Sequence, residues 1–499
     1  MSKKIVLNGN DLKVEDLWKI SRENWNVFLD KSAIKRVEKT RKFIEEFVKS
    51  DTAVYGVTTG FGKLSNKKID LEDIDELQVN LVRSHASGVG NPLSVEEVRS
   101  AMAVRTNVLL KGFSGVRPVV IETLAEMLNR GVVPFIPEKG SVGASGDLAP
   151  SAHLALVLMG EGKAFYKGKL LDGETALKEA GIKPVKLKAK EGLALLNGTQ
   201  FMAGIGGFYL SEISNLFRVA MIAASLSNDV LLGTDRHFDK KIHGARPHRG
   251  QSVVAATMLK FLSGSELRKS HIDCDRVQDA YSLRCVPQVY GAVFDTKEYV
   301  KSVLEIEINS ATDNPLIFPD EREIISGGNF HGEPVAFALD FMAIALSGMG
   351  AMIERRIERM VNPDLSEGLP PFLVKNPGLN SGFMIAHVTA ASLVNQNKIY
   401  SHPSSVDSIP TSANKEDHLS MGMNGALKLR EIFKNLKFLI AIELLTACQA
   451  LDFRRPYRTS NFLENIYKII RNKVPFMERD RNISEDIIKI VKMIDEREI

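Results

Sequence analysis

The residues whose types and spacing could best support catalytic chemistry lie in the glycine-rich segment Gly140-Ser-Val-Gly-Ala-Ser-Gly-Asp-Leu-Ala-Pro150. Glycine recurs here at every third position, and it allows backbone bends that other residues reach only with strain. Such a bend lets the amide nitrogen of Gly146 attack the carbonyl carbon of Ala144. Loss of water closes an imidazolone ring, and dehydration of Ser145 leaves an exocyclic methylene. The product is a strong electrophile, which none of the ordinary side chains supplies.

Three alternatives compete with cyclisation at this segment. The tripeptide Ala144-Ser145-Gly146 alone is expected by chance in roughly one chain in six of this length. A phosphate-binding loop would need Gly-Lys-Ser/Thr, and Asp147 would repel an anion at the start of the next helix. A serine nucleophile in a Gly-x-Ser-x-Gly elbow would need glycine where Asp147 stands. The local residues therefore leave these alternatives open.

The elements that must position this chemistry are mostly helices. Apolar periodicity predicts a helix over 33–49, and Ser94-Val-Glu-Glu97 is a capping-box pattern that opens another. We expect a further helix over 150–159, directly after the glycine-rich segment. Three long stretches have apolar residues around most of the helical circumference, which predicts helices buried among helices: 200–235, 333–361 and 424–451.

Strand patterns are few. Residues 164–173 predict a small hairpin with a Lys-Gly turn, and no alternation of strands and helices indicates a Rossmann-type sheet. We therefore expect a mainly α protein in two domains. Residues 1–199 would carry the glycine-rich loop and the hairpin, and residues 200–499 would form a bundle of long helices.

Composition limits the function. The 499 residues are 44% hydrophobic and 25% charged, as in a globular protein with ample material for a core. The net charge of +4 gives no reason to expect nucleic acid or a membrane as partner. The N-terminus lacks an apolar stretch long enough for a signal peptide, so we expect a cytoplasmic protein. The chain has only three cysteines, Cys274, Cys285 and Cys448. So few cysteines, and an odd number of them, suit a reducing compartment.

No metal site is expected from the sequence. His237, His243 and His248 lie among basic residues, a pattern typical of an exposed loop. Neither a His-Glu-x-x-His pattern nor a set of cysteine and histidine ligands occurs.

Further motifs surround the glycine-rich segment in a fixed order. They are VYGVTTGFG at 54–62, SHASGVG at 84–90, NGTQ at 197–200, QDAYSLRCVPQ at 278–288, ATDNPL at 311–316, GGNFHGEP at 327–334 and SSVDSIPTSANKEDHLSMG at 404–422. With GSVGASGDLAP, these motifs closely resemble the aromatic amino acid ammonia-lyase and aminomutase family, whose cofactor is 4-methylidene-imidazol-5-one (MIO). The resemblance runs from about Val54 to about Pro456. It implies an L-aspartase/fumarase-like bundle of long helices and a homotetramer with shared active sites.

The resemblance also implies roles for single residues. Ala144-Ser145-Gly146 matches the tripeptide that becomes MIO, and Asn197 matches the amide that binds the cofactor's oxygen. Tyr55 matches the acid/base tyrosine of a mobile loop. A phenol has a reference pKa of about 10, so its anion would need a stabilising neighbour. Glycines at 60 and 62 are candidate hinges of this lid.

Four more matches concern the substrate. Arg284 matches the arginine that binds the carboxylate, for which a planar bidentate donor is well suited. Tyr281 matches a second tyrosine, near the substrate amine. Gln278 and Phe330 match residues that line the pocket.

Two positions bear on which amino acid is bound. Ser84-His85 resembles the branch that acts on histidine, since other branches have His-Leu or Phe-Leu there. Glu416 matches that branch's glutamate, whose carboxylate can accept an imidazole N–H. A histidine and a glutamate in one pocket suit a polar imidazole better than a bare phenyl ring. Three residues depart from the branch pattern: Ala280, Gly332 and Lys415.

We therefore expect the non-oxidative deamination of L-histidine to trans-urocanate and ammonia, with Tyr55 or Glu416 as base for the β-proton. Some tyrosine aminomutases share Ser-His and QDAY, so a tyrosine ammonia-lyase or tyrosine 2,3-aminomutase is the alternative. A helical scaffold without activity fits the retained Ala144-Ser145-Gly146, Tyr55 and Arg284 poorly. Fumarase-type lyases are disfavoured because no GSxxMPxK loop occurs.

Overall fold

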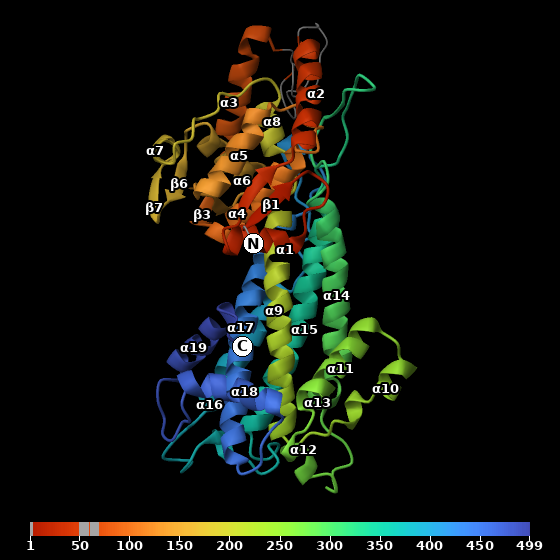
Figure 1. The fold of residues 1–499 in the computed structure, drawn as a ribbon, viewed down its shortest axis with the longest axis vertical. Helices are drawn as coiled ribbons and strands as arrows, with labels where there is room; N and C mark the ends of the chain where they lie inside the picture. Colours follow the sequence, from red (N-terminus) through yellow and green to blue (C-terminus); the bar gives the residue numbers. More distant parts are fainter. Residues whose placement is uncertain (1–2, 49–58, 60–68) are drawn as a thin grey trace. The chain divides into compact units, whose positions relative to one another are not determined.

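The computed structural model of the chain describes residues 3–48, 59 and 69–499, and most of these residues are helical (Figure 1). The predicted mainly α class is confirmed. The residues group into two compact units, which are described separately. Unit 1 contains Met1–Ser211, Val300–Asp340 and Pro403–Leu427, and unit 2 contains Glu212–Tyr299, Phe341–His402 and Lys428–Ile499. The domain division expected between residues 199 and 200 stays a prediction.

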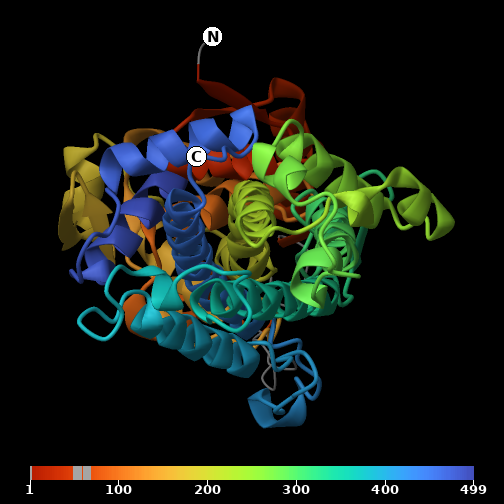
Figure 2. The ribbon, with the colours of Figure 1, turned by 90° about the horizontal axis from the view of Figure 1, so that it is seen from below.

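Four long helices have residues in both units. They are α9 (Gln200–Val230), α14 (Val286–Glu307), α15 (Glu333–Val361) and α17 (Gly422–Phe453). Three of them match the long apolar stretches of the sequence, and α9 is seen end-on in yellow-green in Figure 2. By length and composition α15 could span a membrane, but 56% of its most apolar stretch is buried in the chain. Such burial is typical of a core helix.

Unit 1 contains the shorter N-terminal helices. They are α1 (Val14–Arg22), α2 (Lys31–Val48), α3 (Ile74–His85), α4 (Val95–Leu109), α5 (Pro118–Arg130), α6 (Leu148–Leu158), α7 (Gly173–Glu179) and α8 (Glu191–Leu196), with the 3-10 turns η2 (Leu71–Asp73) and η5 (Ser412–Asn414). The predicted capping box opens α4: the Ser94 hydroxyl accepts from Glu97 N at 3.2 Å, and Ser94 N donates to the Glu97 carboxylate at 2.8 Å. All residues of α4 from Glu97 onward are buried, so the helix lies in the core of unit 1.

The strands of unit 1 are short. They form the parallel pair β1 (Lys4–Leu7) and β2 (Asn26–Leu29), the antiparallel pairs β3 (Val89–Pro92) with β5 (Pro137–Lys139) and β8 (Leu316–Phe318) with β9 (Glu323–Ile325), and a sheet of β4 (Val133–Pro134), β6 (Lys163–Tyr166) and β7 (Lys169–Asp172). The predicted hairpin is β6–β7, beside α7 in Figure 1. Its turn residues Lys167 and Gly168 have φ of +48° and +77°, as two-residue hairpin turns favour.

Unit 2 adds short helices around its shares of the long ones. They are α10 (Lys240–Ala245), α11 (Arg249–Leu262), α12 (Glu266–Ser270), α13 (Tyr281–Arg284), α16 (Met384–Tyr400), α18 (Asn461–Lys473) and α19 (Ile483–Asp495), with the 3-10 turns η3 (Arg236–Phe238) and η4 (Pro371–Leu373).

A buried ionic network joins the long helices inside unit 2. Arg356 of α15 and Glu443 of α17 form an ion pair in which both side chains are fully buried. The guanidinium also donates to Tyr290 OH at 2.6 Å, and the Ser227 hydroxyl donates to the Glu443 carboxylate at 2.8 Å. Burial raises the pKa of Tyr290 to about 12, so this phenol stays protonated. Each of the four helices α9, α14, α15 and α17 thus contributes one polar partner.

The expectation that the histidines near 237–248 form an exposed loop is wrong for two of them. His243 is 2% exposed; its Nε2 lies 3.1 Å from the His237 carbonyl oxygen and its Nδ1 accepts from Gln251 Nε2 at 3.0 Å. The side chain of His237 is 11% exposed, and burial lowers its pKa to about 4. The pattern failed because the neighbouring basic residues are exposed while these two rings pack inward.

Candidate active site

The glycine-rich segment folds as a tight turn in front of α6. Gly146 N donates to the Gly143 carbonyl at 3.2 Å, so Ala144 and Ser145 stand at the tip of the turn. Ser145 has a φ of +49°, a left-handed conformation that a residue with a β-carbon adopts only when its surroundings impose it. The backbone is thus sharply bent at the tripeptide that a ring closure would join.

Neighbouring backbone holds this turn from two sides. A β-carbon on Gly146 would lie 2.2 Å from the Gly198 carbonyl oxygen, and one on Gly143 would lie 2.2 Å from the Ser420 hydroxyl. Gly198 N donates to the Ser145 carbonyl at 3.0 Å, and Asp147 N donates to the Gly198 carbonyl at 2.8 Å. The turn is therefore compressed between residue 198 and residue 420, and only glycine fits at both contact points.

Asp147 anchors the turn to the start of α9. Its buried carboxylate accepts from the backbone N–H of Phe201 at 3.0 Å and of Met202 at 2.9 Å, and from the Ser141 hydroxyl at 3.1 Å. Burial raises the pKa of Asp147 to about 7, against the lowering effect of these donors. The sequence pattern indicated Asp147 only as an argument against a phosphate-binding loop and a serine nucleophile elbow, and it gave no sign of this anchoring contact.

A hollow of about 320 Å³ opens beside the turn. It is lined by Ser84, His85, Ser87, Gly140, Ser141, Val142, Ala144, Gly146, Leu148, Ala149, Thr411 and Ser412. This volume lies at the lower end of the range for small-molecule sites, about 300–1,000 Å³. A larger hollow of about 700 Å³ lies in unit 2 between residues 235 and 259, but none of the predicted site residues lines it.

His85, at the end of α3, presents a neutral imidazole to this hollow. Its Nδ1 lies 2.8 Å from the Leu81 carbonyl oxygen, and because a carbonyl only accepts, Nδ1 carries the proton. Burial lowers the pKa of His85, although Leu81 and the charge of Glu416 oppose the shift. The ring is thus neutral at pH 7 and its Nε2 can accept a hydrogen bond.

Glu416 is fixed by the loop that follows residue 410. One carboxylate oxygen accepts from the hydroxyls of Thr411, at 2.9 Å, and Ser412. The other oxygen accepts from the Ser145 hydroxyl at 3.4 Å, across 271 positions of sequence. The fold therefore brings Glu416 to the side chain that must lose water if the turn cyclises.

Asn197 directly follows α8 and precedes Gly198, which contacts the turn. Its side-chain nitrogen donates to the Asp313 carboxylate at 3.1 Å and to the Asn314 carbonyl at 2.8 Å. Asp313 forms a fully buried ion pair with Lys190 at 2.8 Å. Neither Lys190 nor Asp313 was predicted as a site residue; Asp313 stands in the ATDNPL run, whereas Lys190 belongs to none of the recognised motifs.

The remaining predicted residues fall into three groups. Phe330 is half-buried in unit 1, just before α15. Gln278, Tyr281 and Arg284 belong to unit 2, where Gln278 and Tyr281 are exposed and the Arg284 guanidinium lies 4.5 Å from the Tyr281 ring. Tyr55 and its motif, apart from Thr59, lie outside the described residues.

The residues present fit an MIO group. Ala144-Ser145-Gly146 forms the sharp turn that a ring closure needs, with a donor from Gly198 already on the Ser145 carbonyl oxygen. In residues 3–48, 59 and 69–499, no cluster of three histidine, cysteine, aspartate or glutamate side chains could hold a metal ion.

Nearly the whole length of the chain matches known proteins. A family profile described as "Aromatic amino acid lyase" matches residues 12–472. The chain belongs to the aromatic amino acid lyase family. The family expected from the motifs is thereby confirmed, and with it the assignment of the chain as a carbon–nitrogen lyase.

Within the aromatic amino acid lyases, one curated relative is "Histidine ammonia-lyase" of Koribacter versatilis, 54% identical over 97% of this chain and 96% of its own length. Among solved structures, histidine ammonia-lyase from Trypanosoma cruzi matches with a TM-score of 0.92 at 43% identity, over 99% of this chain and 93% of that one. A tyrosine aminomutase from Streptomyces globisporus matches with a TM-score of 0.94 at 38% identity, over 99% and 97%.

Proposed function

We propose that this lyase converts L-histidine to trans-urocanate and ammonia with an MIO group formed from Ala144-Ser145-Gly146. One observation carries the proposal: His85 lines the hollow at the compressed turn, and Glu416 reaches the tip residue Ser145. The identity of 54% to a curated histidine ammonia-lyase supports the same substrate.

The MIO group supplies an electrophilic carbon beside the bound amino acid. The surrounding chain has the properties that such a group needs. Gly198 N would donate to the carbonyl oxygen that the ring retains from Ser145. Asp147, the residue that follows the tripeptide, would be held in place by the contact of its carboxylate with Phe201 N. Asn197 would fix Gly198 through its contacts with Asp313 and Asn314.

Recognition of the imidazole falls to His85 and Glu416. A neutral imidazole has one N–H donor and one lone pair, and histidine differs from phenylalanine in both. The carboxylate of Glu416 accepts the substrate N–H, and a site built around such a bond rejects an analogue that lacks it. The unprotonated Nε2 of His85 accepts from the substrate, either at its ammonium group or at its ring.

We assign the binding of the substrate carboxylate to Arg284. Within the described part of the chain its Nε is buried without a hydrogen-bond partner. A guanidinium with an unused donor is suited to a carboxylate ligand. Tyr281, whose ring packs against this guanidinium, would then lie next to the substrate amine. Removal of the β-proton is assigned to Tyr55 or Glu416, and the carbon–nitrogen bond breaks as the double bond forms.

We also propose that four copies assemble with shared active sites in the cytoplasm. In unit 2, large apolar side chains are exposed one helical turn apart: Phe341 and Ile344 on α15, and Ile385 and Val388 on α16. Apolar stripes of this kind on single helices mark surfaces that a partner chain covers. A further copy is the natural occupant, because Gln278 and Tyr281 are also exposed in the single chain.

The test combines mass and activity. The purified chain is expected to be two waters lighter than its sequence. Ser145→Ala has no hydroxyl to lose, so it is expected not to reach that difference and to lose turnover. Incubation with L-histidine, L-tyrosine and L-phenylalanine separately is expected to give urocanate from histidine alone. Formation of β-tyrosine or coumarate without urocanate would establish the tyrosine alternative instead.

A further inference from the structure

The short helix α8 lies between two charged groups at its start and the turn-holding residue at its end. Lys190 and Glu191 stand at its first turn, and Asn197 follows its last residue. Both charged side chains are completely buried. Burying charge this deeply is unfavourable unless each group is paired, so these positions require specific partners.

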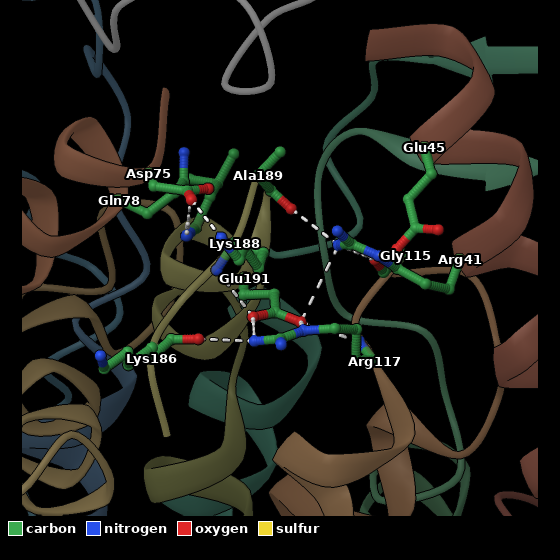
Figure 3. Close-up of polar contacts among 11 residues, drawn as sticks. Arg41, Glu45, Asp75, Gln78, Gly115, Arg117, Lys186, Lys188, Ala189 and Glu191 are labelled. Carbon is green, nitrogen blue, oxygen red and sulfur yellow. Dashed lines mark hydrogen bonds and ion pairs between the residues drawn. The ribbon is translucent and has the colours of Figure 1, made fainter. Parts of the chain in front are cut away.

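Glu191 fixes the backbone at the start of α8. Its carboxylate accepts from Arg117 N, Nε and Nη2 at 2.7–2.9 Å and from Lys188 N at 2.8 Å (Figure 3). Arg41 of α2 donates to the Ala189 carbonyl at 3.0 Å. These contacts hold Lys190 between two anchored neighbours, in a left-handed conformation with a φ of +67°.

Lys190 thereby reaches Asp313 in the core of unit 1. The ammonium group of Lys190 donates to one oxygen of the Asp313 carboxylate at 2.8 Å, and the Asn197 amide donates to the other oxygen at 3.1 Å. Burial alone raises the pKa of Asp313, but Lys190 and Arg105 outweigh it, so that the pKa falls below its ordinary value. The carboxylate is therefore charged, and it is shared between the lysine, the Asn197 amide and the backbone N–H of Asn314, which donates at 2.7 Å.

Three stretches of backbone lie against one another at the turn: residues 145–146, 197–198 and 312–314. Gly198 contacts Gly146 on one side, and a β-carbon on Gly198 would lie 2.3 Å from the Thr312 carbonyl oxygen on the other. Asp313 follows Thr312 directly and binds the residue before Gly198. The contact between Asp313 and Asn197 thus joins the 312–314 stretch to the 197–198 stretch, which presses on the turn.

Arg105 is a competitor for the same carboxylate. It is fully buried, and within the described residues neither its Nε nor its Nη2 has a hydrogen-bond partner. Its charge acts on Asp313. Without Lys190, we expect the carboxylate to turn toward these unused donors, which leaves the Asn197 amide held by the Asn314 carbonyl alone.

We propose that Lys190 is a positioning residue for the turn at Ala144-Ser145-Gly146: by holding Asp313 it keeps Asn197 and Gly198 pressed against the turn, so that cyclisation goes to completion. This inference rests on the proposed formation of MIO. It assigns a function to a buried ion pair more than forty positions from the tripeptide in sequence.

The experiment replaces Lys190 with methionine, which has a similar length and no charge. The soluble, folded protein is weighed intact, and kcat and KM for L-histidine are measured on the same sample. In K190M the fraction of chains lighter by two waters is expected to fall from nearly all to a minority. We expect kcat to fall in proportion to that fraction while KM stays unchanged.

Two companion variants separate positioning from stability. Arg99→Met removes another buried cation of unit 1, one that donates to the Ile20 and Leu128 carbonyls and takes no part in holding α8; it is expected to lower the thermal midpoint while cyclisation stays complete. In the double variant K190M/D313N, a neutral amide still accepts from Asn197 but is attracted less by Arg105 than a carboxylate is. Its cyclised fraction is expected to exceed that of K190M.

The outcomes are distinct. A fully cyclised K190M with wild-type kcat overturns the inference, and so does a double variant no better than K190M. If K190M yields no folded protein, Lys190→Gln replaces it; a neutral amide holds Asp313 less firmly, so undiminished cyclisation there also contradicts the inference. A wild-type chain with its full sequence mass contradicts the proposed function itself.

Discussion

Replacing Glu416 with glutamine tests how the imidazole is recognised. The hydroxyls of Thr411 and Ser412 both donate to one oxygen of the carboxylate. In E416Q we expect the amide oxygen to occupy that position, because it can accept from both hydroxyls as they stand, whereas the amide nitrogen would require both hydroxyls to turn and accept. The amide nitrogen then takes the place of the oxygen that faces Ser145. A charged acceptor next to the tip of the turn thus becomes a neutral donor.

The size of the effect follows from that exchange. A hydrogen bond to a charged group contributes about 1.5–3 kcal/mol, and each 1.4 kcal/mol changes a rate constant tenfold. The substrate N–H would face a donor, so at least this contribution is lost. We expect kcat/KM for L-histidine to fall about 10- to 150-fold.

The assay follows urocanate by its ultraviolet absorbance, with L-phenylalanine as a competitive inhibitor. A phenyl ring has no N–H, so its inhibition constant is expected to stay unchanged in E416Q. The matched control is Glu161→Gln, which breaks the surface pair with Arg83 and should leave kcat/KM as it was. An E416Q enzyme with full kcat/KM, or one weakened equally toward phenylalanine, would refute the recognition by Glu416.

Three further predictions concern a buried acid, a buried ion pair and a tightly packed glycine. The pKa of Asp147 is raised from 3.8 to about 7. The contribution of this group to stability is therefore greatest below pH 3.8 and is lost as the pH rises to about 7. The difference in denaturation midpoint between wild type and Asp147→Asn should change across that window. Glu443→Gln leaves Arg356 buried without its counter-ion and should cost about 3–5 kcal/mol in chemical unfolding, whereas Glu431→Gln at the half-buried pairs of α17 should cost at most about 1 kcal/mol. Gly198→Ala, with its β-carbon on Thr312, should yield little cyclised protein by intact mass, whereas Gly131→Ala, in open space, should cost only about 1–2 kcal/mol.

The helices were the predictable part of the fold. The stretch 333–361 coincides with α15, and the Ser94 capping box and the 164–173 hairpin were both confirmed, because each depends on residues close in sequence. The parallel pair β1–β2 escaped prediction, since four-residue strands carry too short a pattern. The inward packing of His237 and His243 escaped it as well, because composition shows that a segment is basic but not which side chains turn inward.

For the site, sequence identified the groups that do chemistry but not the groups that hold them. Ala144-Ser145-Gly146 and its match to a known family indicated the electrophile. Lys190 and Asp313 are separated by 123 positions, and nothing local in either segment indicates that they pair in the core. Partners of this kind become visible only when the fold brings distant loops together.

Glu416 links the two stages of this enzyme's chemistry. Before cyclisation its carboxylate accepts from the Ser145 hydroxyl, the group whose loss as water creates the methylidene carbon. After cyclisation that hydroxyl no longer exists, and the same oxygen becomes available to the imidazole of a substrate. A substitution at 416 can therefore reduce turnover either by leaving Ser145 intact or by failing to bind the ring. Intact mass distinguishes the two, because only the first leaves the chain heavier than the mature wild type, by one water if the ring has closed and by two if it has not.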